Sequence, residues 1–127
     1  MNVKQVIVIR RDLKMRRGKE VAQGSHASMM FLSLMVQQRL LDGERTQLSQ
    51  AQQAWITGRF TKVCVQVPDE AALLAVAEEA RKAGLECHVV TDAGLTEFGG
   101  VPTNTCLAIG PDEADKIDMV TGKLSLY

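Results

Sequence analysis

Residues 3–9 read VKQVIVI and residues 11–27 read RDLKMRRGKEVAQGSHA, and these two stretches decide the fold. The first is a β-branched run that is short enough for a buried strand. The second crowds basic residues around one glycine and then opens a helical pattern that continues from about Gly18 to Leu41. A buried strand that leads through a short turn into a long helix predicts an α/β layered sheet.

The turn between this strand and this helix is strongly basic. Backbone N–H groups point outward at a helix N-terminus, and the helix dipole favours negative charge there. We therefore expect the turn to receive an anion. The candidate binding residues are the five cations of the turn and its flanks: Arg10, Arg11, Lys14, Arg16 and Arg17.

Three polar residues share one face of the long helix. Lys19, Gln23 and His26 are spaced i, i+4 and i+7, which places all three on the same side. A face packed on a sheet seldom carries three polar groups, so the spacing favours a functional site. Two simpler interpretations stay open: Lys19 as a surface cation, and His26 as a core histidine with satisfied hydrogen bonds.

The rest of the chain alternates helical and strand-like patterns. Long crossovers allow parallel strands, whereas the link over 92–104 has no helix and predicts one antiparallel pair. We see no linker or repeat and expect residues 1–127 to form a single three-layer α/β domain with a four-stranded mixed β-sheet flanked by helices. The expected strands are 3–9, 62–67, 86–91 and 105–109, and the expected helices are 18–41, 48–57, 70–83 and a short last one from Pro111.

A polar loop follows the third expected strand and reads DAGLTEFGGVPTN over residues 92–104. Asp92 and Thr96 lie just after that strand, and Thr105 begins the next one. Polar groups at strand ends of α/β folds commonly line the site. A carboxylate there can position or deprotonate a water, and hydroxyls can hold the water or a reacting carbonyl. Asp92 to Gly94 is also an ordinary turn sequence, which leaves a purely structural interpretation open.

The charges are unevenly distributed although the formal net charge is zero. Residues 1–62 carry eleven Lys and Arg against four Asp and Glu, whereas residues 63–127 carry four against eleven. A basic half that forms one surface can steer a polyanion despite the neutral total. The alternative is that the two halves simply attract each other.

The three cysteines, Cys64, Cys87 and Cys106, lie in apolar strand-like runs without CxxC spacing. They are typical of buried thiols in a reducing compartment. With no signal peptide or long apolar span in view, we expect a cytoplasmic protein without a membrane partner. Other classes are excluded: RRGKE lacks the first glycine and the Ser/Thr of a P-loop, Ser25 has no nucleophile-elbow context, and the histidines and cysteines lack metal-ligand spacing.

Three segments, in this order along the chain, resemble the archaeal and eukaryotic-type (class II) peptidyl-tRNA hydrolases: RDLKMRRGKEVAQGSHA, DAGLTEF, and TNTCLAIGP followed by KIDMVTGKLSL. The similarity covers essentially the whole chain and is weakest between about Leu34 and Arg59. It implies cleavage of the ester that joins a peptide to the 3′ ribose of tRNA, on a compact α/β domain with a four-stranded mixed sheet. It also implies that no metal or cofactor takes part, and often a homodimer.

The resemblance assigns candidate catalytic residues by motif. The family's essential lysine and its two partners on the helix face, its acidic residue, the threonine four positions further on and the threonine directly before the last strand correspond here to Lys19, Gln23, His26, Asp92, Thr96 and Thr105.

The chain departs from the family pattern in the loop after Asp92. Glu97 stands where the family usually has glutamine, and the GGVPTN segment is one residue longer than usual. We expect the extra negative charge of Glu97 to repel tRNA phosphate and to raise the pKa of the Asp92 carboxyl.

These observations together predict a peptidyl-tRNA hydrolase. Lys19 would stabilise the anionic tetrahedral intermediate or the terminal phosphate, Asp92 would activate or orient water, and Thr96 and Thr105 would hold the reacting groups. The five cations of the basic turn would hold the tRNA backbone. Two alternatives stay open: a non-catalytic RNA-binding module, and a hydrolase of another small acyl ester or amide.

Overall fold

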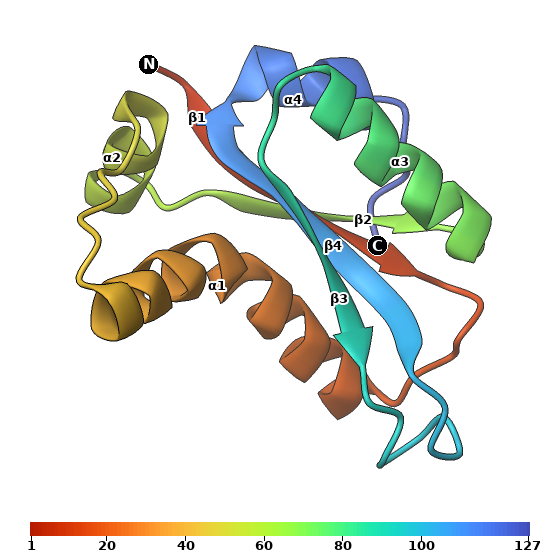
Figure 1. The fold of residues 1–127 in the computed structure, drawn as a ribbon. Helices are drawn as coiled ribbons and strands as arrows, with labels where there is room; N and C mark the ends of the chain where they lie inside the picture. Colours follow the sequence, from red (N-terminus) through yellow and green to blue (C-terminus); the bar gives the residue numbers. More distant parts are fainter.

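The computed structural model describes residues 1–127, which are arranged around a four-stranded sheet of order β2-β1-β4-β3 (Figure 1). β1 (Val3–Arg10) is parallel to β2 (Lys62–Val67) and antiparallel to β4 (Thr103–Glu113). β3 (Cys87–Asp92) forms the other edge and is antiparallel to β4. The mixed sheet expected from the sequence is confirmed, including the antiparallel pair where the connection has no helix.

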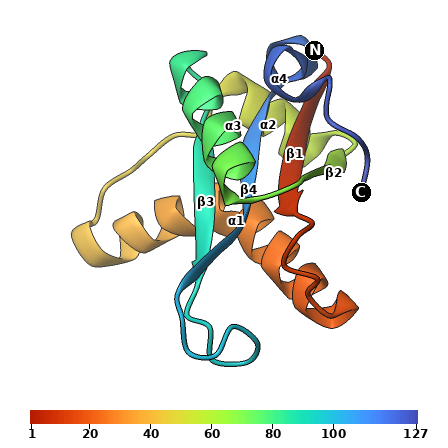
Figure 2. The same ribbon diagram turned by 90° about the vertical axis from the view of Figure 1, so that its right-hand side faces the viewer.

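Helices cover both faces of the sheet and give the expected three layers (Figures 1 and 2). α1 (Arg17–Asp42) and α2 (Gln50–Thr57) lie on one face, and α3 (Glu70–Lys82) and α4 (Ala114–Thr121) lie on the other. α1, α3 and α4 each pack against the strand that precedes them in the sequence.

The alternation of side chains along β1 divides the apolar core in two. Val6 and Val8 belong to the larger cluster beneath α3 and α4. Ile9 belongs to a smaller cluster beneath α1, which also contains Ala27 and Cys106. The smaller cluster fixes the N-terminal half of α1 on the β4–β3 side of the sheet.

The end of β4 differs from the sequence expectation. We expected a helix to begin at Pro111, but β4 continues to Glu113 before α4 starts. Gly110 and Pro111 together lie opposite the single residue Gln5 of β1, where the pairing register shifts. This β-bulge accommodates a proline inside the strand, because a residue at a bulge does not need to donate a ladder hydrogen bond.

α1 is anchored to the sheet along its N-terminal half only. Its buried residues all lie between positions 23 and 31. Ser28 is fixed to β1 because its hydroxyl donates to Gln5 Oε1 and its carbonyl accepts a hydrogen bond of 2.9 Å from Gln5 Nε2. The later turns keep apolar side chains such as Val36 and Leu40 exposed. The helix thereby brings its first turns to the end of the sheet where β3 stops (Figure 1).

Candidate active site

The first turns of α1 meet the end of β3 and the loop that follows it, residues 93–102 (Figure 1). Lys19 of α1 reaches Asp92, the last residue of β3, and their Nζ and Oδ1 atoms are 2.9 Å apart. Each of these side chains is only 14% exposed. An ion pair that is largely withdrawn from water therefore joins the two segments that the sequence singled out.

Two further donors hold the Asp92 carboxylate. Gln23 Nε2 lies 3.4 Å from Oδ1, and the backbone N–H of Gly94 donates to Oδ2 at 2.9 Å. The hydrogen bond from the Lys19 ammonium lowers the pKa of the Asp92 carboxyl below its usual value, and the Gly94 N–H adds to this effect while burial opposes it. Asp92 is therefore an ionised carboxylate at neutral pH.

Thr96 completes the cluster from the loop side. Lys19 Nζ donates to the Thr96 hydroxyl at 2.9 Å, so the ammonium bridges a carboxylate and a hydroxyl. Phe98 packs nearby, with the centre of its ring 5.9 Å from Lys19 Nζ. The interpretation of Lys19 as a free surface cation is thereby replaced by a lysine fixed in position by Asp92 and Thr96.

Thr105 lies behind this cluster and not at its surface. Its side chain is fully buried, and its hydroxyl donates to Gln23 Oε1 at 2.5 Å. Because this hydrogen bond occupies the side-chain oxygen of Gln23, the side-chain nitrogen, Nε2, is the atom that faces Asp92. Thr105 therefore orients Gln23 and has no exposed surface with which to touch a ligand.

His26 follows Gln23 on the same side of α1 but takes no part in these contacts. Its side chain is exposed, and it forms no hydrogen bond to another residue. The interpretation of His26 as a buried core histidine is therefore wrong. It lies about one helical turn beyond Gln23, in the direction away from Lys19.

Glu97 does not act on Asp92 as we expected. The expectation that it raises the pKa of the Asp92 carboxyl is wrong, since that pKa is lowered. Glu97 instead faces Arg16, and Arg16 Nε lies 2.7 Å from Glu97 Oε1. The additional negative charge is therefore paired with a cation.

The five cations of the basic turn differ in how far they are already paired. Arg10 is saturated: it contacts both carboxylate oxygens of Asp12, the carboxylate of Glu70 and the carbonyl of Asn104, and its side chain is 10% exposed. Arg11 donates to the Gln66 amide oxygen at 3.3 Å. Arg10 is therefore a structural residue that ties the end of β1 to its neighbours.

The other three cations of the turn remain accessible. Arg16 is 78% exposed and is paired only with Glu97. Lys14 and Arg17 are exposed and form no ion pair with another residue. Lys14 and Arg16 directly precede α1, whereas Arg17 faces a groove on the other side of that helix.

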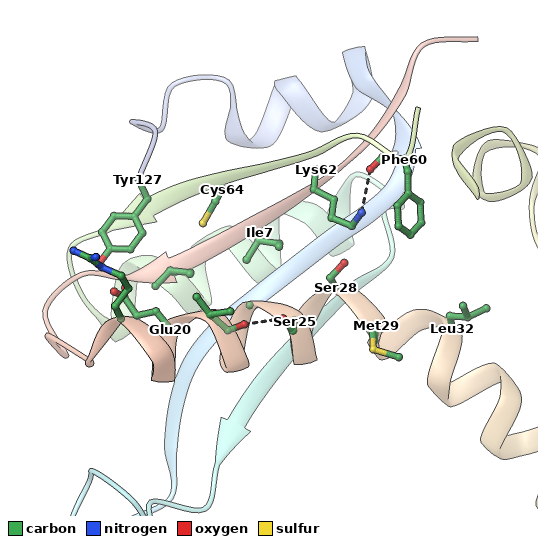
Figure 3. A pocket seen from close by; sticks show the side chains of 14 residues that line it. Ile7, Glu20, Ser25, Ser28, Met29, Leu32, Phe60, Lys62, Cys64 and Tyr127 are labelled. Carbon is green, nitrogen blue, oxygen red and sulfur yellow. Dashed lines mark hydrogen bonds between the residues drawn. The ribbon is translucent and has the colours of Figure 1, made fainter. Parts of the chain in front are cut away.

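An apolar groove of about 740 Å³ lies along α1 and the neighbouring parts of β1 and β2 (Figure 3). Helical spacing places Lys19 on the opposite side of α1. The floor of the groove is the part of β1 and β2 that α1 leaves uncovered, with Ile7 and Cys64, and its rim includes Met29 of α1, Phe60 and Tyr127. The sequence analysis missed this groove. The available signal was a row of apolar residues on α1 at helical spacing that are all exposed: Val21, Met29, Leu32, Val36 and Leu40.

The cysteines are packing residues, as the sequence indicated. Cys87 and Cys106 are buried, and Cys64 is half-buried. Burial raises the pKa of the Cys87 and Cys106 thiols to about 11, so neither is a nucleophile at neutral pH. No group of three or more His, Cys, Asp or Glu side chains is arranged to hold a metal ion. No helix combines the length and the apolar character needed to cross a membrane.

The cluster at the start of α1 is suited to polar acyl chemistry. Lys19 supplies a fixed positive charge, and such a charge stabilises an oxyanion that develops beside it. Asp92 supplies an ionised acceptor that can orient a water molecule, and Gln23 and Thr96 add directional polar groups. The arrangement contains no activated serine or cysteine, and its carboxylate can position a water as the nucleophile.

Comparison with known proteins agrees with this chemistry. Residues 3–127 match the family model described as peptidyl-tRNA hydrolase PTH2. The peptidyl-tRNA hydrolase of Methanocaldococcus jannaschii is 40% identical over 124 residues, which cover 98% of this chain and 99% of that protein. The peptidyl-tRNA hydrolase of Methanopyrus kandleri is 42% identical over 125 residues, 97% of each chain.

A human relative, named peptidyl-tRNA hydrolase 2, mitochondrial, is 40% identical over 98% of this chain and 64% of its own length. Matches of this extent run through β1, the basic turn, α1 and the β3–β4 loop alike. The chain therefore belongs to the peptidyl-tRNA hydrolase PTH2 family.

Proposed function

We propose that this protein is an enzyme that hydrolyses the ester bond between a peptide and the 3′ ribose of tRNA, releasing free tRNA and the peptide. The observation that carries the proposal is the Lys19–Asp92 ion pair, with Gln23 and Thr96 around it, in a chain that matches the PTH2 family over residues 3–127. Residues 1–127 act as one functional domain, and the site of action is the cytoplasm, which agrees with three unpaired cysteines.

The roles of the site residues follow from their contacts. Water attacks the ester carbonyl carbon, and the ammonium of Lys19 stabilises the resulting oxyanion. Asp92 holds both Lys19 and the attacking water in position. A carboxylate with a lowered pKa is a weak general base, so orientation is its main contribution and the water reacts through positioning and charge.

The residues around this pair maintain its geometry. Thr105 orients Gln23, and Gln23 in turn keeps Asp92 directed at Lys19. Collapse of the tetrahedral intermediate breaks the bond to the 3′ oxygen, which leaves as the ribose hydroxyl after taking up the proton that the attacking water gives up. Because Lys19 supplies the positive charge, the reaction requires no metal or cofactor, and a chelator is expected to leave the rate unchanged.

Binding of the tRNA falls to the accessible cations next to the site. Lys14 and Arg16 are exposed and directly precede α1, so they are the best placed to contact the acceptor end. Phosphate contacts position the nucleic acid without reading its sequence. Arg10 contributes indirectly, by fixing the end of β1 from which the basic turn departs.

The test is cleavage of an N-acylated aminoacyl-tRNA by the purified protein, followed as release of free tRNA. We expect turnover that falls steeply with salt, because several phosphate contacts must form. Tight tRNA binding without cleavage would indicate a non-catalytic RNA-binding module. Cleavage of a small acyl ester with a shallow salt dependence, and none of the tRNA ester, would indicate a different hydrolase.

We also propose that the protein is a homodimer joined through the groove on the far side of α1. Met29 and Leu32 belong both to the groove (Figure 3) and to the exposed apolar row on α1, which continues to Val36 and Leu40. An apolar face of this kind is unsuited to a polyanion. The face combines a hollow with protruding side chains such as Met29 and Phe60, and it carries both a cation, Arg17, and an anion, Glu20. A two-fold interface contacts itself, so it needs such complementary features within one surface.

The size of this face agrees with a dimer interface. Fourteen residues line the groove, and Val36 and Leu40 extend the same side of α1. A standard interface takes about 20–30 residues from each partner, including a polar rim. Light scattering should give twice the chain mass, Met29→Glu should give monomers, and Leu41→Glu, on another face of α1, should leave dimers. A monomeric wild-type protein at micromolar concentration would contradict the proposal.

A further inference from the structure

We propose that Glu97 is a positioning residue for substrate binding: it holds Arg16 so that the free edge of the guanidinium receives a phosphate of the tRNA acceptor end beside the Lys19–Asp92 pair. The inference rests on the proposed function, because it assigns a step in the binding of peptidyl-tRNA. It gives the carboxylate at position 97 a role opposite to the repulsion that its charge alone suggests.

The geometry of the Arg16–Glu97 pair leaves half of the guanidinium available. Arg16 Nε donates to Glu97 Oε1 at 2.7 Å, and neither Nη atom of Arg16 has a hydrogen-bond partner. Glu97 is 15% exposed, whereas Arg16 is 78% exposed. The carboxylate is thus the more enclosed member of the pair, and the open edge of the guanidinium lies in solvent. Two parallel N–H donors on one edge match two phosphate oxygens.

Arg10 shows what an arginine used only for structure looks like in the same segment. All three of its nitrogen atoms are engaged, by Asp12, Glu70 and the Asn104 carbonyl, and its side chain is 10% exposed. No edge of that guanidinium remains for a ligand. Arg16 is paired at one nitrogen only, so its pairing orients the group without saturating it.

The position of Arg16 suits the last phosphate of a tRNA whose ester lies at Lys19. Glu97 directly follows Thr96, whose hydroxyl accepts from Lys19, so one short loop holds both cations. The reacting ester is on the 3′ ribose, and the nearest phosphate is on the other side of that nucleoside. Arg16, held by Glu97, forms an anion site next to the contact between Thr96 and Lys19. We expect the phosphate nearest to the ester to bind at this site.

Orientation has a measurable energetic consequence. An unrestrained arginine loses side-chain conformational entropy when it binds a ligand. Pairing with the enclosed Glu97 carboxylate already restricts Arg16, so less entropy is lost when the phosphate binds. If Glu97 acts in this way, its removal weakens binding. If it acted only as a repulsive charge, its removal would strengthen binding. The two roles therefore predict changes of opposite sign in KM.

The experiment measures kcat and KM for N-acylated aminoacyl-tRNA in single and double variants. Glu97→Ala should raise KM by about two- to tenfold, with a much smaller change in kcat, because only the orientation of a binding group is lost. Arg16→Ala should raise KM on the order of tenfold or more, because a charged hydrogen bond to phosphate is lost. The double variant should match Arg16→Ala alone, since Glu97 acts only through Arg16.

Three further variants make the result specific. Glu97→Gln retains an acceptor oxygen for Arg16 Nε and should keep KM close to the wild-type value. Arg16→Lys retains the charge but not the planar guanidinium edge, and should raise KM even with Glu97 in place. Glu78→Ala removes a carboxylate paired with Lys82 on α3, on the far face of the sheet, and serves as the control.

A lower KM in Glu97→Ala, or a Glu97→Ala effect of equal size in the Arg16→Ala background, would overturn the inference. If Glu97→Ala fails to fold, Glu97→Gln decides the question: an unchanged KM supports positioning, because an acceptor for Arg16 Nε is retained, whereas a lower KM indicates repulsion and overturns the inference. Absence of cleavage by the wild-type protein would instead overturn the proposed function, so the two failures are distinguishable.

Discussion

Lys19 and Asp92 form an ion pair that affects the charge state and the position of both side chains. Both are mostly withdrawn from solvent, and the Lys19 ammonium holds the pKa of the Asp92 carboxyl below its usual range. An isolated charge at either position would lose much of its hydration without compensation. The pairing offsets this loss for both groups and keeps a cation and an anion side by side in the candidate site.

The pKa shift predicts a pH profile. Because the folded-state pKa of Asp92 is lowered, the carboxylate stays ionised well into the acid range and protonates only below the usual aspartate value of about 3.9. We expect kcat/KM to stay flat from about pH 7 down to about pH 5, measured with an acid-stable substrate ester and a parallel check of folding by circular dichroism. A loss of activity centred between about pH 6 and pH 7 would contradict this expectation.

Thr105 supports a second prediction at this scale. Thr105→Val keeps the shape of the side chain but leaves the buried Gln23 carbonyl oxygen without its donor. Gln23 then loses its fixed orientation, and we expect kcat to fall by roughly ten- to a hundredfold, the range for a displaced active-site group. Thr105→Ser retains the hydroxyl and is the matched control. Equal kcat in the Thr105→Val and wild-type proteins would show that the orientation of Gln23 does not matter.

Sequence reasoning at the residue scale succeeded where spacing within one element decides the outcome. The i, i+4 spacing of Lys19 and Gln23 was sufficient to place them on one side of α1, facing Asp92. Spacing did not show that Arg10 is fully paired whereas Arg16 is largely free. Their partners come from distant segments: Glu70 and Asn104 for Arg10, and Glu97 for Arg16. Ion pairs between elements follow from the tertiary arrangement, which no local pattern encodes.

At the scale of elements, the loop between β3 and β4 is the part that assembles the site. Its Gly94 N–H binds Asp92, its Thr96 accepts from Lys19, and its Glu97 binds Arg16. The loop is closed on itself by a 2.8 Å hydrogen bond from the Gly100 N–H to the Gly94 carbonyl. The loop therefore carries several groups of the candidate site although it lies outside the regular elements.

Gly94 tests this role. Its φ is +80°, and a Cβ there would lie 2.3 Å from the backbone oxygen of Val101, so Gly94→Ala forces the loop to rearrange. We expect kcat to fall by roughly a hundredfold, because the groups around Lys19 move, while the core and the melting temperature change little.

Gly99→Ala is the matched control for this prediction. Gly99 also has a positive φ, +59°, but a Cβ there meets nothing within 4 Å. It therefore has the same backbone preference without the clash. Equal losses of kcat in the two variants would show that strain, and not displacement of the site, is the cause.

The boundaries of elements show the limit of local patterns. Apolar runs and the absence of a crossover helix predict the strands and the mixed sheet correctly. The predicted helix start at Pro111 is wrong. The β-bulge opposite Gln5 lets the strand continue through it to Glu113. Proline has no N–H to donate, so a strand can continue through it only where the neighbouring strand does not require that hydrogen bond, as at a bulge. The sequence around the proline does not show this.

At the scale of the whole molecule, α1 separates two surfaces with different properties. One side carries Lys19 and the end of the basic turn, and the other side faces the apolar groove (Figure 3). Two surfaces on opposite sides of one helix can be occupied at the same time. A second copy in the groove would leave the Lys19–Asp92 pair open to tRNA.

The uneven charge distribution predicts that the salt dependence of tRNA binding comes from the cations of the basic turn. Lys14→Ala removes an exposed, unpaired cation of the basic turn, and we expect the slope of log affinity for tRNA against log salt to become shallower by about one unit. Lys116→Ala removes an exposed cation of α4 on the opposite face of the sheet and is the control. Equal slopes for Lys14→Ala and wild type would show that the basic turn does not contact phosphate.

The central claim is that the Lys19–Asp92 pair catalyses hydrolysis of peptidyl-tRNA. The most direct measurement is the single-turnover rate of N-acylated aminoacyl-tRNA cleavage by the wild-type and Asp92→Asn proteins, with tRNA affinity measured in parallel. We predict a rate about 10²–10³ lower in Asp92→Asn, the usual cost of losing a positioned catalytic group, with tRNA affinity within about threefold of wild type. Cleavage by Asp92→Asn at the wild-type rate would contradict the account.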